Sequence, residues 1–165
     1  MNRLAIALTI SAALASTLAH ADAPDLSKVN GSLTTEAGKA YGDIDTVNGS
    51  ISIEEKTVAQ TVETVNGSIG VVASHVGGDV QTVRGDITIG LDSHVSGGVR
   101  VEKATGFFNT DRKRPPRIII GPNAVVEGPL VFERPVTLHV HKSARTGPVT
   151  GATAQGFDGD SAPKD

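Results

Sequence analysis

The chain has 165 residues, which is the usual size of a single domain. Its formal net charge of −3 at pH 7 argues against general binding to nucleic acid or to an anionic membrane surface. There is no cysteine, so the sequence excludes disulfide bonds, thiolate metal sites and a cysteine nucleophile.

Residues 1–21 have the order of a secretory signal peptide. A positive start at Arg3 precedes an apolar run over residues 4–18, and the small-x-small pattern Ala-His-Ala follows. This run is shorter than the ~20 residues that a transmembrane helix needs. We therefore expect cleavage between Ala21 and Asp22, a periplasmic or secreted location, and no membrane span in the mature chain.

A unit of 18 residues then recurs four times. The units begin at Asp25, Asp43, Thr61 and Asp79, and each carries Val-Asn-Gly-Ser or Val-Arg-Gly-Asp at the same place. Apolar residues recur with the same period, at Ile44, Val47, Ile51, Ile53 and Val58 and again at Val62, Val65, Ile69, Val71 and Val76.

The composition of these units predicts strands. Segments such as Ile51-Ser-Ile53 alternate apolar and polar residues, as does a strand with one buried face. Val, Ile, Thr and Gly dominate and straight-chain helix formers are sparse. Because one short unit cannot bury its own apolar face, neighbouring units must stack. The predicted fold class is all-β, a single-stranded parallel β-solenoid with about 18 residues and three short strands per coil.

The repeat becomes looser after Ile89. Residues 74–80 align with residues 93–99 at an offset of 19, and residues 123–130 align with 143–149 at 20 and then 19. Between these pairs, residues 104–117 contain two prolines and four basic residues, which predicts a loop. We therefore expect a solenoid domain over residues 22–150 with a loop near 104–117, and a flexible tail over residues 151–165.

Two stretches resemble known families. The Val-Asn-Gly-Ser-Ile-x-Ile units over about Leu26–Val101 resemble exported bacterial β-strand-repeat domains of the adhesin type. The stretch Gly121–Leu130, within residues 118–151, is similar to the coils of bactofilins, which are polymer-forming β-helical scaffold proteins. The resemblance implies a solenoid that acts as a scaffold or as a binding surface.

The Asn-Gly pairs admit two interpretations. Each matches the N-glycosylation pattern, but they all occupy one phase of the repeat, where a tight corner needs a pair that tolerates positive φ. Asn side chains stacked from coil to coil can also hydrogen-bond as a ladder. We favour this structural corner ladder, formed by Asn30, Gly31, Asn48, Gly49, Asn66, Gly67, Arg84 and Gly85.

The histidines do not form the ligand pattern of a metal site. His75 and His94 occupy matching places, and His139 and His141 lie two apart in an expected strand. No acidic residue recurs beside them, whereas zinc sites use three or four protein ligands. We expect no metal and no other cofactor.

The acidic residues bear on an enzymatic alternative. Asp43, Asp45, Glu54, Glu55, Glu63, Asp79 and Asp86 are scattered over several phases of the coil. No catalytic residue is assigned from them. The alternative to a non-enzymatic protein is a carbohydrate-active β-helix enzyme, which would place two carboxyl groups ~5–10 Å apart in a groove on one solenoid face.

A basic and aromatic cluster lies in the expected loop, at Phe107, Phe108, Arg112, Lys113, Arg114 and Arg117. It is either a solvated loop or a contact with an acidic partner. The leading hypothesis is a non-enzymatic exported envelope protein, a rigid scaffold or adhesin-like surface for an envelope glycan or protein. Because solenoid ends expose unpaired backbone groups, a homo-oligomer or polymer is a further possibility.

Overall fold

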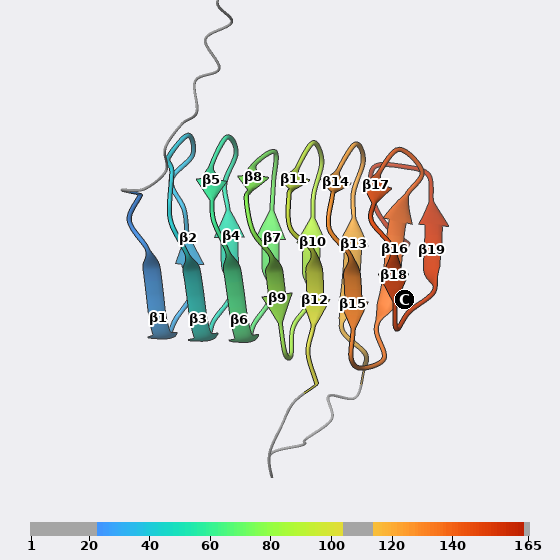
Figure 1. The fold of residues 1–165 in the computed structure, drawn as a ribbon, viewed down its shortest axis with the longest axis horizontal. Coiled ribbons are helices and arrows are strands. Elements are labelled where there is room, and N and C mark those ends of the chain that lie inside the picture. Colours follow the sequence, from blue (N-terminus) through green and yellow to red (C-terminus); the bar gives the residue numbers. More distant parts are fainter. Residues whose placement is uncertain (1–22, 104–113, 164–165) are drawn as a thin grey trace, which may run out of the picture.

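The computed structural model describes residues 23–103 and 114–163 and confirms the predicted fold class. These residues form three parallel sheets that wind into about seven coils, and the coils stack side by side along the long axis of the molecule (Figure 1). The described chain contains no helix, and thus none with the length and hydrophobicity of a membrane span.

Each coil contributes one strand to sheet A and one to sheet B, and the five inner coils also contribute one to sheet C. Sheet A holds β1 (Leu26–Asn30), β3 (Ile44–Asn48), β6 (Val62–Asn66), β9 (Val80–Thr82), β12 (Val99–Val101), β15 (Leu130–Phe132) and β18 (Val149–Thr150). Sheet B holds β2 (Leu33–Thr34), β4 (Ile51–Ile53), β7 (Ile69–Val71), β10 (Ile87–Ile89), β13 (Arg117–Ile120), β16 (Thr137–His141) and β19 (Ala154–Phe157). Sheet C holds β5 (Val58–Ala59), β8 (His75–Val76), β11 (His94–Val95), β14 (Val125–Val126) and β17 (Arg145–Thr146).

The strand register confirms the alignments made from the sequence. Ile44 pairs with Val62, and Ile51 pairs with Ile69, at the interval of 18. The offset of 19 appears where His75 pairs with His94. The later offsets of 20 and 19 appear where β14 pairs with β17 and β15 with β18. Each irregular interval therefore changes a corner and leaves the strand pairing parallel.

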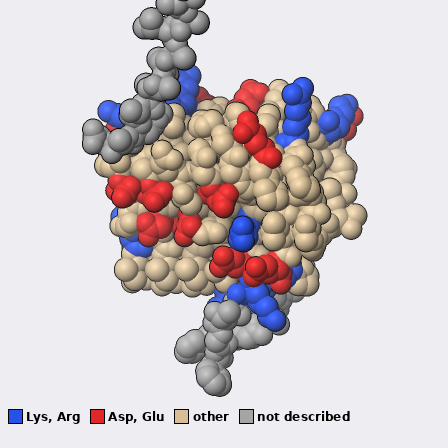
Figure 2. All heavy atoms as spheres, viewed as in Figure 1, with Lys and Arg blue, Asp and Glu red and all other residues tan. Residues whose placement is uncertain are grey.

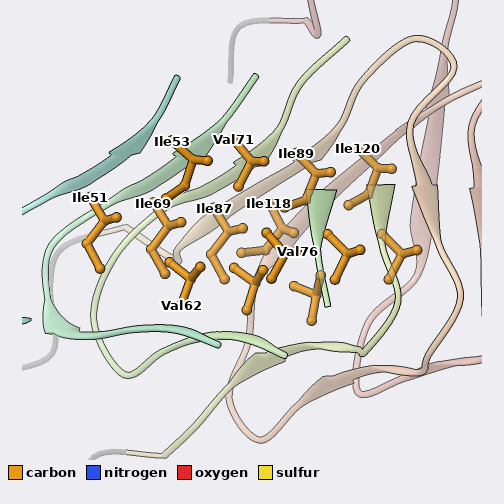
Figure 3. Packing of buried hydrophobic residues seen from close by; sticks show 14 of the residues in the cluster. Ile51, Ile53, Val62, Ile69, Val71, Val76, Ile87, Ile89, Ile118 and Ile120 are labelled. Atoms are coloured by element: carbon orange, nitrogen blue, oxygen red, sulfur yellow. The ribbon is translucent and has the colours of Figure 1, made fainter. Parts of the chain in front are cut away.

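The interior is a set of apolar rows that run through the coils. Figure 3 shows Ile51, Ile69, Ile87 and Ile118 in one row and Ile53, Val71, Ile89 and Ile120 in the next. All these side chains are buried and belong to one cluster that extends from Leu33 to Leu138. Burial of rows this long is the main stabilising term of the fold.

One inward row is polar. Thr46, Thr64 and Thr82 are buried, while the neighbouring Val47 and Val65 are about 40% exposed. The buried hydroxyls donate to the carbonyl oxygens of Gly31, Gly49 and Gly67 in the preceding coil, at 3.3, 3.0 and 3.5 Å. Threonine occupies this inward position because its hydroxyl satisfies the glycine carbonyl, which would be destabilising if it were buried without a hydrogen-bond partner.

The predicted end of the solenoid at residue 150 is wrong. Strand β19 pairs with β16 over Ala154–Phe157, and Phe157 is buried with its ring 5.0 Å from that of His141. The open edge of β16 offers hydrogen-bond partners to the backbone, so a segment of low strand propensity still joins the sheet. The predicted signal peptide and its cleavage site at Ala21 and Asp22 lie outside the described residues.

Candidate functional site

The corner between sheets A and B carries the expected asparagine ladder in the coils of β1, β3 and β6. Asn48 Nδ2 donates to Asn30 Oδ1, and Asn66 Nδ2 donates to Asn48 Oδ1, both at 3.0 Å. The Ser50 and Ser68 amides donate to the preceding serine hydroxyls at 3.3 Å. These amide and hydroxyl groups are used between coils, which supports the structural interpretation of the motif.

The expected reason for glycine at this corner is wrong for three of the four units. Only Gly31 has a positive φ, of +113°, whereas Gly49, Gly67 and Gly85 do not. A Cβ at Gly67 would instead lie 1.9 Å from the carbonyl oxygen of Gly49. Glycine is required because stacked corners bring one backbone against the next.

Positive φ angles occur at the second corner of the coil, between sheets B and C. Lys56, Ala73, Asp92 and Asn123 have φ between 43° and 58°. The Lys56 amide donates to the Ala73 carbonyl, and the Ala73 and Asp92 amides donate to the carbonyls of Leu91 and Pro122 in the next coil. The sequence carries no shared residue type at this corner, so no motif indicated it.

Asp86 anchors the chain where it returns from the insertion that follows β12. One oxygen accepts from the Arg117 amide at 2.9 Å, and the carboxylate also pairs with the Arg114 guanidinium at 2.6 Å. Asp86 continues the serine column of the earlier coils, since it aligns with Ser68 at the interval of 18. The change from Asn-Gly-Ser to Arg-Gly-Asp thus places a carboxylate beside the insertion.

The basic cluster is only partly described. Arg114 and Arg117 both bond to Asp86 through the contacts above, and Arg117 begins strand β13, so it belongs to the solenoid. The guanidinium of Arg117 also donates to the Pro163 carbonyl. Phe107, Phe108, Arg112 and Lys113 lie outside the described residues.

An acidic groove lies on the outer face of sheet A. It is lined by Asp45 of β3, Glu63 of β6 and Glu102 after β12, together with the exposed side chains of Val47 and Val65. Figure 2 shows acidic side chains gathered on this face of the molecule. The groove has a volume of about 170 Å³.

One row of outward side chains, in register from β1 to β12, explains the electrostatics of this groove. The row runs from Ser27 through Asp45, Glu63 and Gln81 to Arg100. Ser27 donates to Asp45 and Gln81 donates to Glu63, so the two carboxylates are adjacent and each has a neutral partner on its other side. Adjacent strands lie about 4.8 Å apart, which brings the two acids close.

The pKa of Glu63 is raised. The largest cause is desolvation by partial burial, opposed by the hydrogen bond from Gln81, and the negative charges of Glu102, Asp43 and Asp45 raise the pKa further. A raised carboxyl pKa in a groove is a property that acid catalysts share with structural acidic clusters.

Other acidic side chains accept hydrogen bonds from backbone amides of the next coil. The Asp25 and Asp43 carboxylates accept from the amides of Asp43 and Thr61 in the next coil, at 2.9 and 3.1 Å. Asp79 accepts from the amide of Gly98 at 2.7 Å. The position that Asp25, Asp43 and Asp79 share in the repeat is therefore structural.

The histidines form two separate groups. The rings of His75 and His94 lie edge to face at 4.8 Å on sheet C, and His94 Nε2 is 2.9 Å from a Glu127 oxygen. His139 and His141 are buried on β16. Over residues 23–103 and 114–163, no group of three or more His, Asp or Glu side chains is arranged to hold a metal ion.

Comparison of the chain with protein-family models, with curated proteins and with solved structures finds no significant match. The resemblance to adhesin-type repeat domains and to bactofilins therefore stays a prediction from the motifs.

Proposed function

We propose that the protein is a non-enzymatic component of the bacterial envelope, exported by its signal peptide, whose rigid β-solenoid presents a binding surface. The observation that carries this proposal is the single buried cluster running from Leu33 to Leu138. Because one close-packed interior joins the coils, outward side chains keep a fixed spacing of about 4.8 Å. Such a surface suits a ligand that is itself extended.

The acidic groove on sheet A is the proposed contact for an envelope glycan. Its carboxylates accept hydrogen bonds from sugar hydroxyls, and its exposed valines offer apolar contact. Asp45 and Glu63 are the two residues on which this contact depends. The resemblance to adhesin-type repeats supports the same assignment.

Cosedimentation of the mature protein with purified insoluble cell-wall glycan tests this proposal. We expect saturable binding that the double variant Asp45→Asn, Glu63→Gln weakens at least tenfold. Glu55→Gln changes an exposed carboxyl outside the groove and is the matched control. Absence of binding, or an equal loss in the control, would contradict the glycan surface.

A carbohydrate-active enzyme is the second candidate, supported by the raised pKa of Glu63 beside Asp45. Retaining glycosidases place an acid and a nucleophile about 5–5.5 Å apart. The same glycan samples can be assayed for new reducing ends. Their release by the native protein, abolished in Glu63→Gln, would replace the non-enzymatic proposal with this one.

Self-association remains a proposal, and the first coil offers an argument against it. Among the described residues β1 is the last strand at its end of sheet A. Its Lys28 is exposed, lies in register with the inward Thr46 and Thr64, and donates through its ammonium to the Ser32 carbonyl at 3.3 Å. A charge at an inward register position of an edge strand opposes pairing with another chain. Light scattering on the mature protein and on Lys28→Thr tests this: we expect more association in the variant, and equal masses would discount the lysine.

The export proposal has its own test. The intact mass of protein recovered from the periplasm or medium should correspond to a chain that begins at Asp22. Recovered protein that retains residues 1–21 would contradict the signal peptide.

A further inference from the structure

A larger hollow lies on the outer face of sheet B, beside the end of the chain. Residues 158–163, named here the C-terminal strap, run back from the end of β19 across this face. The Asp158 carboxylate pairs with the Lys142 ammonium at 2.5 Å, and the Pro163 carbonyl accepts from the Arg117 guanidinium. The strap is thereby held at both ends, beside β16 and beside β13.

Between the strap and the sheet is a pocket of about 520 Å³. Its floor includes Thr88 of β10 and Ile119 of β13, and Leu91 and Pro122 stand at its side. Phe157 of β19 and Ala162 of the strap complete the lining. A volume within 300–1,000 Å³ and a mainly apolar lining are typical of sites for small molecules.

The pocket is elongated along the axis of the solenoid. Its lining extends from β10 to β19, which are separated by three strand spacings in the order of sheet B. At about 4.8 Å per spacing, this span is about 14 Å. A span of this length favours a chain-like ligand over a compact ring.

The charges of the lining select against a charged ligand. Arg117 and Asp160 both line the pocket and contribute opposite charges, so the lining has no net charge. An ion that left water for this apolar space would lose hydration without a matching excess of opposite charge. A neutral chain with a hydroxyl or ester end loses less.

We propose that this pocket binds the acyl or alkyl chain of an uncharged lipid-like molecule. The site lies on sheet B and is independent of the glycan surface proposed for sheet A. Leu91 lines the pocket and is 51% exposed although its side chain is large and apolar.

Displacement of the neutral fluorescent probe 1-aminoanthracene by 1-decanol tests the proposal. We expect saturable probe binding to the mature protein, competition by 1-decanol, and at least tenfold weaker competition by decanoate or decyltrimethylammonium at pH 7.5. Leu91→Glu should weaken probe binding at least tenfold. Val72→Glu is the matched control, because Val72 is 44% exposed and lies outside the pocket.

Three results would overturn the proposal. One is the absence of saturable probe binding to protein whose circular dichroism and melting temperature show it to be folded. Another is an equal loss of binding in both variants. Stronger competition by either charged compound than by 1-decanol would show an ion site instead of the neutral-chain site.

Discussion

The coils that contain β3 and β6 differ from those that contain β12 and β15 at the same corner. The early coils turn from sheet A to sheet B through Asn-Gly-Ser, with an asparagine ladder outside and threonine inside. In the coil of β12 this corner is replaced by the insertion, and the inward threonine column continues as Val101 and Phe132. The apolar rows of sheet B pass through both regions without interruption.

This difference shows which features the coil requires. The interior rows and the parallel register are retained, while the corner between sheets A and B can accept a ladder or a long insertion. An inward threonine hydroxyl is needed where a stacked glycine corner turns its carbonyl toward the core. In the later coils, Val101 and Phe132 occupy the same inward row. Function is therefore to be sought where the corners and outer faces depart from the repeat.

The largest effect is expected where regular corners stack. Gly67→Val would press a side chain against the Gly49 carbonyl, 1.9 Å from the position of the new Cβ, and should destabilise the protein by more than about 3 kcal/mol. Gly70→Ala is the control, because a Cβ there meets nothing within 4 Å. Chemical denaturation should show the control within about 0.5 kcal/mol of the native protein. Similar losses in both variants would refute the stacking explanation.

The next largest loss of stability is expected when the inward hydroxyl of Thr64 is removed. Thr64→Val keeps the shape of the side chain but leaves the Gly49 carbonyl without the 3.0 Å bond, and should cost about 1–3 kcal/mol in the free energy of unfolding. Thr64→Ser retains the hydroxyl and should lose less. If the valine variant were as stable as the native protein, the early coils would need no threonine and the contrast with Val101 would have no physical basis.

The second corner offers a gain in stability. Ala73 has φ of 43°, a region that glycine occupies without the steric cost of a Cβ. Ala73→Gly should therefore raise the free energy of unfolding by about 0.5–1 kcal/mol. Ala40→Gly changes an alanine without a positive φ, and there glycine should lower stability. A loss in both variants would show that the corner is unstrained.

The asparagine ladder should contribute less. Asn48→Ala removes two exposed side-chain hydrogen bonds and should cost about 1 kcal/mol, and Asn30→Ala removes one and should cost about half as much. Thermal melts of both variants measure the difference. Arg84 already replaces asparagine in the fourth unit, so a much larger loss would mean that the ladder is essential to the early coils.

The smallest effect concerns the pH dependence of the acidic row. Because the pKa of Glu63 is raised in the folded state, the folded protein binds more protons than the unfolded protein at pH values just above the ordinary Glu pKa. The free energy of unfolding therefore falls as the pH rises through that range. Glu63→Gln should melt higher than the native protein at neutral pH, and the difference should vanish below pH ~4. A variant that melts lower at pH 7 would contradict this sign.

From the sequence alone, the repeat predicted the all-β solenoid, its register and the offsets of 19 and 20. It could do so because strand pairing is parallel and the interval between stacked residues is the repeat length itself. The asparagine ladder followed from the same periodicity, since equal residues at equal phase must lie side by side.

Only the tertiary structure decided what occurs between coils at irregular positions. The close backbone approach at Gly67, the strained corner at Ala73 and the anchoring of Arg114 by Asp86 depend on contacts that no spacing encodes. The pocket beside Ile119 arises because β19 pairs with the edge of sheet B and the strap lies on the outer face of that sheet. The composition of this segment had predicted a flexible tail. Local propensity could not predict this, because the partners that stabilise the last strand belong to a different coil.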